Sequence, residues 1–186
     1  MTTSAAEGLR APDIAGVVEA WRAWRVTVID DEYVLGSVLR QICWPPHRPL
    51  RAECLHHRLP VAWFGGRRHE APEGSCQCGI YGAQLPQVSH YLCEMPFSER
   101  GARPTVARVL GQVALWGTVV ECERGFRASH AYPIRIYVPR DDHFREFADA
   151  DRVVAGLSCY GVPVEPMDAS CAEAPRVLAR EFANDD

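Results

Sequence analysis

The sequence contains no lysine, so arginine supplies all 20 of its basic side chains. This absence is typical of coding bias in a GC-rich genome, although the planar guanidinium also suits contacts with anions. No apolar run approaches the ~20 residues that span a bilayer, and the first 13 residues lack the charged and apolar regions of a secretory signal. We therefore expect a cytoplasmic protein without a membrane segment, in which cysteines stay reduced.

The motifs of several common enzyme classes are absent as well. The chain has no Gly-x-Ser-x-Gly elbow, no P-loop and no dinucleotide fingerprint. The zinc-deaminase signature requires His-x-Glu followed by Pro-Cys-x-x-Cys, whereas here His69 and Glu70 are adjacent and the cysteines form Cys-x-Cys. These absences identify no substrate, and they favour a role other than catalysis.

The composition fits one ordinary globular domain. The 186 residues are 47% hydrophobic and 24% charged, which is enough apolar material to bury a core. Alternating apolar residues predict strands, and helical spacing predicts helices, mostly late in the chain. The predicted strands cover 22–29, 33–39 and 50–54 and a β meander over 106–139, and the predicted helices begin at residue 86 and cover 141–160 and 169–182. Turn residues at Arg124-Gly125 divide the meander, and Gly111, Gly117 and Pro133 predict bulges or bends within it. We expect a flexible segment over 1–18 and then a single α+β domain over 19–182, with an antiparallel β-rich body and C-terminal helices.

Cysteine and histidine gather in the segment 50–82. Three cysteines (Cys54, Cys76 and Cys78) and three histidines (His56, His57 and His69) lie there. Thiolate and imidazole are the ligands that a tetrahedral Zn²⁺ prefers, and a closed Cys₃His set is typical of a structural site. A long, Pro- and Gly-punctuated loop is uncommon unless something holds it. We therefore predict a zinc-knuckle loop over 50–82. The alternative is a chance grouping of buried thiols and surface histidines.

Two histidines compete for the fourth ligand position. By spacing, Cys54-x₂-His57 is the natural partner of Cys76-x-Cys78, because two ligands close together in the sequence reach one metal ion at a low entropic cost of loop closure. His69 lies further from Cys54 in the sequence but nearer to Cys76. The spacing alone therefore favours His57.

Several motifs together resemble a family of uncharacterised, mainly actinobacterial proteins. The resemblance covers about residues 20–140 and is carried by Trp21-Arg22-Ala23-Trp24, Cys54, His69-Glu70-Ala71-Pro72, Cys76-x-Cys78-Gly79-Ile80-Tyr81 and Leu115-Trp116-Gly117. The family has no established activity, so the resemblance implies an architecture and a site but no function. In its pattern the histidine before Ala-Pro recurs, which favours His69 as the ligand, keeps His57 as the rival, and makes 57–68 an insertion in the loop.

Charge is distributed unevenly along the chain. Residues 40–69 carry six arginines and four histidines against one acid, whereas 141–186 carry eleven acids against four arginines. Arginine and aromatic side chains serve phosphate contact and base stacking, so the first segment is a candidate nucleic-acid surface. Its candidate contacts are Arg48, Arg51, Arg58, Trp63, Arg67 and Arg68. The net charge of −4 and the absence of a known nucleic-acid motif count against a nucleic acid, so a protein partner stays an equal alternative.

Two functional interpretations follow. The first is a non-enzymatic, zinc-stabilised binding or regulatory module that recognises a protein or nucleic-acid partner, because three thiolates make zinc a poor Lewis acid and four ligands leave no open position. The alternative is an enzyme that uses a polar pocket on the 118–133 part of the meander. That part carries Glu121, Glu123, Arg127, His130 and Tyr132. Pairing of Glu123 with Arg127 across the turn would be an ordinary cross-strand contact.

Overall fold

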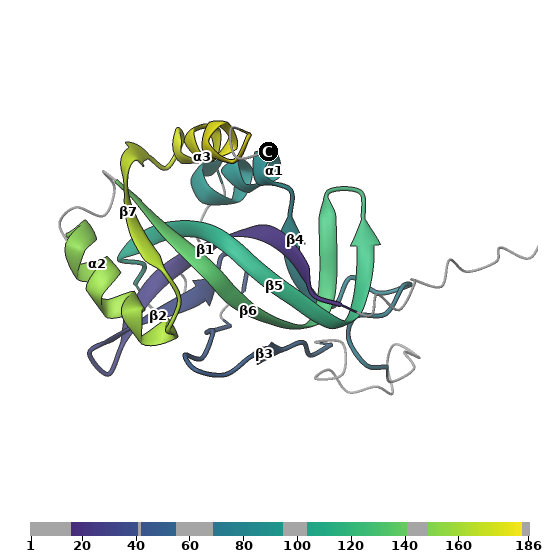
Figure 1. Ribbon diagram of the computed structural model, residues 1–186. Coiled ribbons are helices and arrows are strands. Elements are labelled where there is room, and N and C mark those ends of the chain that lie inside the picture. The colour runs from purple at the N-terminus through teal and green to yellow at the C-terminus, as the bar shows by residue number, and fades with distance from the viewer. Residues whose placement is uncertain (1–15, 41, 55–68, 95–103, 141–148, 184–186) are drawn as a thin grey trace, which may run out of the picture.

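The structure is a computed structural model that describes residues 16–40, 42–54, 69–94, 104–140 and 149–183 (Figure 1). In chain order its elements are β1 (Val18–Ile29), β2 (Glu32–Ser37), β3 (Leu50–Arg51), β4 (Ile80–Ala83), α1 (Leu85–Ser89), the π-helical turn η3 (His90–Glu94), β5 (Ala107–Cys122), β6 (Gly125–Arg140), α2 (Ala150–Leu157), the 3₁₀ turn η4 (Ser158–Tyr160), β7 (Val164–Ser170) and α3 (Ala174–Phe182). The described chain is therefore strand-rich α+β, as predicted. Among these residues, none of the helices has the length and apolar character needed to cross a membrane.

Four strands form a closed circuit of backbone pairing. β5 pairs with β1 along one edge and with β6 along the other, and the short β4 pairs with both β1 and β6. β2 continues the edge of β1 beyond β4, while β3 and β7 continue the edge of β6. Figure 1 shows β5 and β6 as two long, curved ribbons through the centre of the molecule. Because β3 and β4 share one edge of β6, the segments that follow β3 and precede β4 lie close together.

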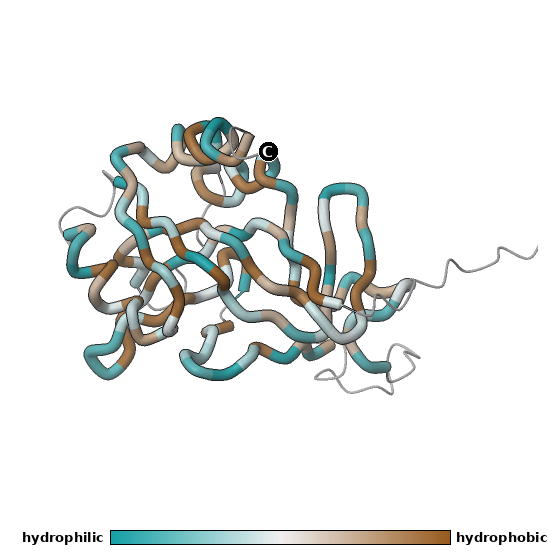
Figure 2. The backbone as a smooth tube through the Cα atoms, viewed as in Figure 1, coloured by the Kyte–Doolittle hydropathy of each residue, from teal (hydrophilic) through white to brown (hydrophobic). Residues whose placement is uncertain are grey.

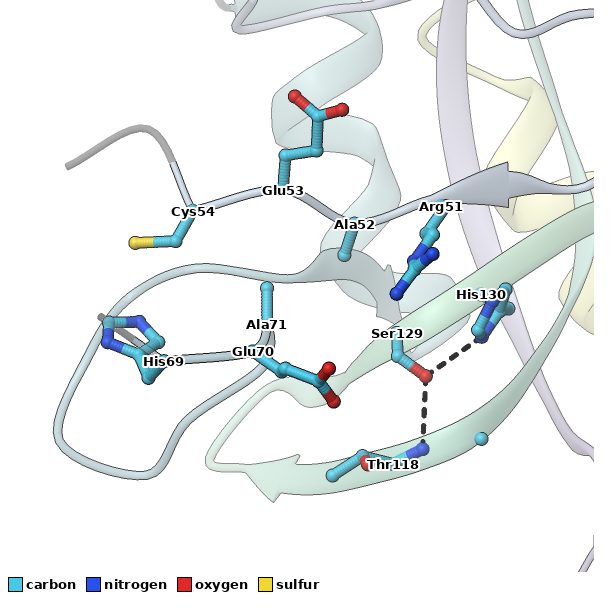
Figure 3. A pocket seen from close by; sticks show the side chains of 11 residues that line it. Arg51, Ala52, Glu53, Cys54, His69, Glu70, Ala71, Thr118, Ser129 and His130 are labelled. Atoms are coloured by element: carbon cyan, nitrogen blue, oxygen red, sulfur yellow. Dashed lines mark hydrogen bonds between the residues drawn. The ribbon is translucent and has the colours of Figure 1, made fainter. Parts of the chain in front are cut away.

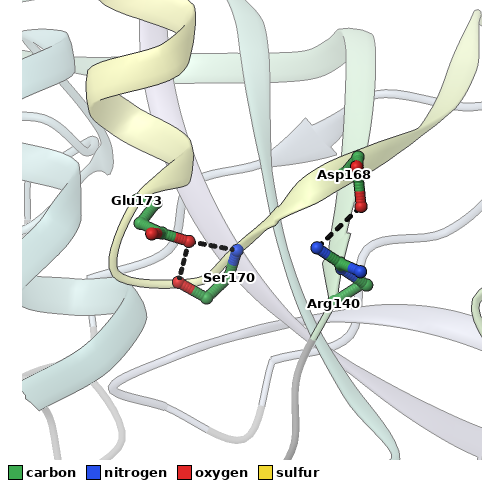
Figure 4. A network of polar contacts seen from close by, with 4 residues as sticks. All are labelled: Arg140, Asp168, Ser170 and Glu173. Atoms are coloured by element: carbon green, nitrogen blue, oxygen red, sulfur yellow. Dashed lines mark hydrogen bonds and ion pairs between the residues drawn. The ribbon is translucent and has the colours of Figure 1, made fainter.

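The sheet is mixed, which corrects the predicted antiparallel body. β7 runs parallel to β6, from the pair Ile136–Val164 to the pair Arg140–Ser170. A parallel pair needs a crossover connection, and the chain between the two strands contains α2 and η4. Arg140 and Asp168 form an ion pair at 2.6 Å that joins β6 to β7 (Figure 4).

The C-terminal helices are shorter than the sequence predicts. α2 begins at Ala150 and is capped by Asp149, and the earlier part of the predicted helix lies outside the described residues. α3 begins at Ala174 rather than at residue 169, because residues 169 and 170 belong to β7. The Glu173 carboxylate accepts hydrogen bonds from the backbone N–H and the hydroxyl of Ser170, which stabilises the turn between strand and helix (Figure 4).

The β5–β6 hairpin replaces the several short strands predicted over 106–139. Each strand has 16 residues, and the predicted turn connects them after Cys122. Register shifts occur between Gln112 and Val113 and between Trp116 and Val119, so the predicted bends are bulges within continuous strands. Pro133 lies opposite Val113 beside the first shift, where a missing backbone donor is tolerated, as predicted.

β1 is buried on both faces, which corrects the predicted half-buried strand. Trp24 and Val26 lie fully buried on one face, where Trp24 packs edge-to-face against Trp44. Arg25 and Thr27, on the opposite face, are 6% and 0% exposed. On that face α1 and α3 form a second core with the alanine at position 23. Figure 2 shows hydrophobic residues along the central strands and a hydrophilic turn between β1 and β2.

Arg22 anchors β4, the strand that follows the turn containing Cys76 and Cys78. β2 and β4 pair with different parts of the same edge of β1, and the Arg22 guanidinium joins them. It donates hydrogen bonds to the carbonyl oxygen of Tyr81 on β4 and, at 3.3 Å, to the hydroxyl of Ser37 on β2. It also lies 4.9 Å from the ring centre of Trp44, and burial lowers the pKa of Arg22 to about 10.

Candidate metal centre

Four side chains meet beside β3 and β4. Cys54, His69, Cys76 and Cys78 each offer a ligand atom, and these atoms all lie within 4.8 Å of one another. Cys54 is buried and the other three are half-buried. We call this set the Cys/His cluster; it lies close enough together to bind a metal ion. The set matches the predicted ligands with His69 in the fourth position, while the rival His57 lies outside the described residues.

The distances within the cluster separate it from a disulfide. The sulfur atoms of Cys54 and Cys76 are 3.8 Å apart, whereas a disulfide requires about 2.05 Å. Nε2 of His69 lies 3.3 Å from the sulfur of Cys78. All eight cysteines of the chain are free thiols. The cluster therefore presents three thiols and one imidazole around a common point.

A tight turn shapes the loop that carries two of the candidate ligands, Cys76 and Cys78. The carboxylate of Glu73 accepts hydrogen bonds from the backbone N–H and, at 2.6 Å, from the hydroxyl of Ser75. The backbone N–H of Cys76 donates to the carbonyl oxygen of Glu73 at 3.1 Å. Gly79 follows with φ +124°, and a Cβ there would lie 3.1 Å from side-chain atoms of Arg127 and of Pro72. Glycine is therefore required where the chain leaves the cluster and enters β4.

Arg127 of β6 holds this turn from the sheet. Its side chain is buried, and its Nη1 donates to the carbonyl oxygens of Cys76 and Cys78, the latter at 3.0 Å. Its Nε donates to the sulfur of Cys122 at 3.2 Å. Burial alone would lower the pKa of Arg127, but the hydrogen bond to Cys122 and the nearby sulfurs raise it above its usual value. The guanidinium thus stays charged against the carbonyl groups of the two cysteines.

This role of Arg127 corrects the predicted pairing with Glu123. Arg127 lies opposite Val120 in the β5–β6 ladder, and Glu123 lies in the exposed turn between the strands. The predicted polar group on the meander is dispersed further, because the hydroxyl of Tyr132 donates to the carbonyl oxygen of Tyr160 at 2.8 Å. The sequence did not indicate this role of Arg127, because its partners in the cysteine turn are backbone carbonyl groups, which carry no sequence signal.

The crowded thiols affect one another's ionisation. Burial, followed by the thiols of Cys76 and Cys54, raises the pKa of Cys78 to about 11. Burial also opposes ionisation of Cys76, but hydrogen bonds from Cys78 outweigh it and lower the pKa of Cys76. One thiol thus ionises readily while its neighbour resists. Three thiolates at this point need a cation to compensate their charge.

A hollow of about 680 Å³ lies beside the cluster (Figure 3). It is lined by residues 51–54, 69–71, 117–118 and 129–130. Cys54 and His69 therefore belong both to the cluster and to the wall of the hollow. Part of the meander segment predicted to form a pocket contributes to this wall, through Thr118, Ser129 and His130.

The β-bulge in β5 shapes one side of the hollow. Gly117 has φ +78°, and a Cβ at this position would lie 2.2 Å from Oγ of Ser129. The hydroxyl of Ser129 occupies the bulge: it accepts a hydrogen bond from the backbone N–H of Thr118 and lies 3.2 Å from the carbonyl oxygen of Trp116 and 3.0 Å from Nδ1 of His130. Bulges commonly re-aim side chains beside functional sites.

Hydrogen-bond counting assigns the tautomer of His130. The Ser129 hydroxyl carries one proton, and donating it to Trp116 leaves its oxygen to accept from Nδ1–H of His130. This arrangement satisfies every group in the network, so we assign the proton of the neutral ring to Nδ1. The ring stacks on Trp116 at 5.9 Å between centres. Nε2 is then the nitrogen left for a ligand.

The predicted arginine surface is described only in part. Arg48 and Arg51 are both exposed, and Arg51 lines the hollow. The other four candidates lie outside the described residues: Arg58, Trp63, Arg67 and Arg68.

Comparison with protein-family models, with curated proteins and with solved structures gave no match. The resemblance to the actinobacterial family therefore stays a prediction. Function has to follow from the chemistry of the described residues.

Proposed function

We propose that the protein is a non-enzymatic binding or regulatory module stabilised by one structural zinc ion in the Cys/His cluster. With zinc–sulfur bonds of 2.3 Å and zinc–nitrogen bonds of about 2.05 Å, a tetrahedral site has S···S edges of about 3.8 Å and S···N edges of about 3.6 Å. The cluster has 3.8 Å between Cys54 and Cys76 and 3.3 Å between His69 and Cys78. The convergence of all four ligand atoms within 4.8 Å, with the Cys54–Cys76 distance equal to a tetrahedral edge, is the observation that carries the proposal.

A structural role fits this donor set better than a catalytic one. Catalytic zinc usually has three protein ligands and keeps one position open for water or substrate. Cys54, His69, Cys76 and Cys78 supply four donors, and three thiolates would leave the ion electron-rich. Arg127 supports the same role, because it ties the carbonyl groups of the cysteine turn to the sheet. The ion would join the segments before β4 and after β3.

The zinc-stabilised segment would support recognition of a partner. Arg48 lies just before β3 and Arg51 within it; both are exposed, and Arg51 lines the hollow together with Cys54 and His69. Their positive charge suits a nucleic acid or an acidic protein surface, and in the sequence three further arginines, at 58, 67 and 68, follow β3 before β4. The charged residues that follow residue 140 are predominantly acidic and would not serve this purpose.

A binding assay at low salt separates the two kinds of partner. Fluorescence anisotropy of the zinc-loaded protein with labelled single-stranded DNA, duplex DNA and RNA tests nucleic-acid binding where electrostatic association is strongest. If the partner is a nucleic acid, affinity falls steeply with added salt, and Arg48→Ala and Arg67→Ala weaken binding without lowering the melting temperature. Absence of binding to all three probes excludes nucleic acid and leaves the protein partner.

An enzyme that acts in the hollow is the second candidate function. It is supported by His130, which lines the hollow with Nε2 left for a ligand and is therefore placed as a base. A measured turnover that is lost in His130→Ala but retained in Glu123→Gln would favour the enzyme over the binding module. The same turnover in both variants would exclude it.

A further inference from the structure

The hollow beside the Cys/His cluster has two walls of different charge. The first is formed by residues 69–71 and by Cys54, and it carries the carboxylate of Glu70. The second is formed by β3 and β6, and it carries the guanidinium of Arg51 and the ring of His130. Figure 3 shows the side chains of Arg51 and Glu70 pointing into the hollow, whereas that of Glu53 points away.

The first wall is electronegative when the metal is bound. Three thiolates around one Zn²⁺ carry a net charge of about −1, and Cys54 and His69 place this centre at the edge of the hollow. Glu70 follows His69 directly, so its carboxylate adds a second negative charge on the same side. This wall would attract an ammonium group.

The second wall offers the positive charge of Arg51 and a fixed, neutral histidine ring. Arg51 and His130 are register partners of β3 and β6, so their side chains lie on neighbouring strands of one sheet. Stacking on Trp116 and the contact with Ser129 fix the ring of His130 and leave Nε2 available as a hydrogen-bond acceptor. Within the described part of the chain, neither Arg51 nor Glu70 has an ion-pair or hydrogen-bond partner.

We infer that the hollow binds a small zwitterion of the amino-acid class, with its carboxylate at Arg51 and its ammonium group at Glu70. This inference rests on the proposed function, because zinc ligands form part of the wall. It gives the binding module a low-molecular-weight ligand, in the position that a regulatory effector would occupy.

Electrostatic complementarity selects this class over a ligand of one charge. A simple anion would pair with Arg51 but be repelled by Glu70 and the thiolate centre. A simple cation would pair with Glu70 but be repelled by Arg51. A ligand with both charges matches both walls and leaves neither charged side chain unpaired. The alanine side chains at positions 52 and 71 keep the intervening lining small, which leaves room for the ligand's carbon chain.

Titration calorimetry of the full-length, zinc-loaded protein tests the inference with a series of probes. Glycine, β-alanine and γ-aminobutyrate carry the same two charges at increasing separation, and alanine is compared with N-acetylalanine (anion only) and alanine methyl ester (cation only). We expect saturable binding of at least one zwitterion and weaker binding of both single-charge analogues. No binding of any zwitterion at millimolar concentration, or equal binding of N-acetylalanine, overturns the inference.

Single substitutions then test which side chain binds the ligand's carboxylate and which binds its ammonium group. Arg51→Gln and Glu70→Gln should each reduce the affinity about tenfold, the scale of one charge-assisted hydrogen bond. Arg124→Gln and Glu123→Gln, which change exposed charges in the β5–β6 turn, should bind as the wild type does. Unchanged affinity in Arg51→Gln or Glu70→Gln overturns the inference. A zinc-loaded, folded protein that binds no zwitterion defeats this inference alone, whereas a folded protein that binds no zinc defeats the proposed function as well.

Discussion

Arg127 donates a hydrogen bond to the carbonyl oxygen of Cys78, 3.0 Å away, although the two residues are 49 positions apart in the chain. The same guanidinium contacts the carbonyl oxygen of Cys76 and the sulfur of Cys122. The closed circuit of strands makes this contact possible, because β4 pairs with β6 at Tyr81 and Arg127, immediately after the cysteine turn. The sheet and the candidate metal centre are thus one structural unit.

Replacing Arg127 should weaken both the fold and metal retention. In Arg127→Ala, the carbonyl groups of Cys76 and Cys78 lose their donor, and we expect a loss of about 2 kcal/mol of unfolding free energy, on the scale of hydrogen bonds to a charged group. Denaturant unfolding and zinc retention against a chelator measure the two effects. Arg124→Ala, an exposed arginine of the adjacent turn, is the matched control. Equal stability of the two variants would show that the Arg127 contacts contribute nothing.

Removing either thiolate of the cysteine turn should destabilise the protein through the metal. Binding energy of a structural ion is also folding energy, so Cys76→Ser and Cys78→Ser should lower the melting temperature strongly. Cys159→Ser, which removes a thiol outside the cluster, should not. Chelator should lower the wild-type melting temperature to that of the variants and leave the variants unchanged. Identical melts with and without either substitution would make these cysteines ordinary packed thiols.

His69→Ala should reduce zinc retention more than His57→Ala. The imidazole of His69 lies within the cluster, and its removal leaves three thiolates and an open position. A competition assay with a chromogenic chelator compares the two variants directly. Faster loss of zinc from His57→Ala would assign the fourth ligand to His57 instead.

Metal retention should fall as the pH is lowered. The pKa of Cys78 is about 11 without metal, so at neutral pH this thiol must release a proton when the ion binds. Each pH unit below that value should therefore weaken binding about tenfold through this thiol alone, and the stability that depends on the metal is lost in the same direction. Zinc release followed between about pH 8 and about pH 5 measures the slope. Retention independent of pH would contradict thiolate ligation.

The sequence predicted the members of the Cys/His cluster better than it predicted their surroundings. Cys54, Cys76 and Cys78 were identifiable because sulfur ligands are few and carry their chemistry in the residue type. His69 required the resemblance, since spacing alone favoured His57. Arg127 was assigned the wrong partner, because a pairing rule along one hairpin cannot show that a distant turn presents its carbonyl groups.

In the sheet, too, the features that depend on contacts between distant segments were not predicted. Alternation along β1 predicted one buried face, but the structure buries Arg25 and Thr27 on the other. That burial depends on tertiary packing of distant segments over the sheet, which no local period records. The parallel pairing of β7 with β6 depends likewise on a crossover through α2. Bulges at Gly117 and beside Pro133 were predicted, because glycine permits a positive φ and proline lacks a backbone donor, and both effects are local.

Elemental analysis of the purified protein, prepared without chelator, tests the central claim most directly. The Cys/His cluster supplies a complete tetrahedral shell, so we expect close to one zinc ion per chain and a large loss of zinc in a Cys54→Ser, Cys76→Ser double variant. A wild-type protein that folds without zinc or any other metal ion would contradict the account.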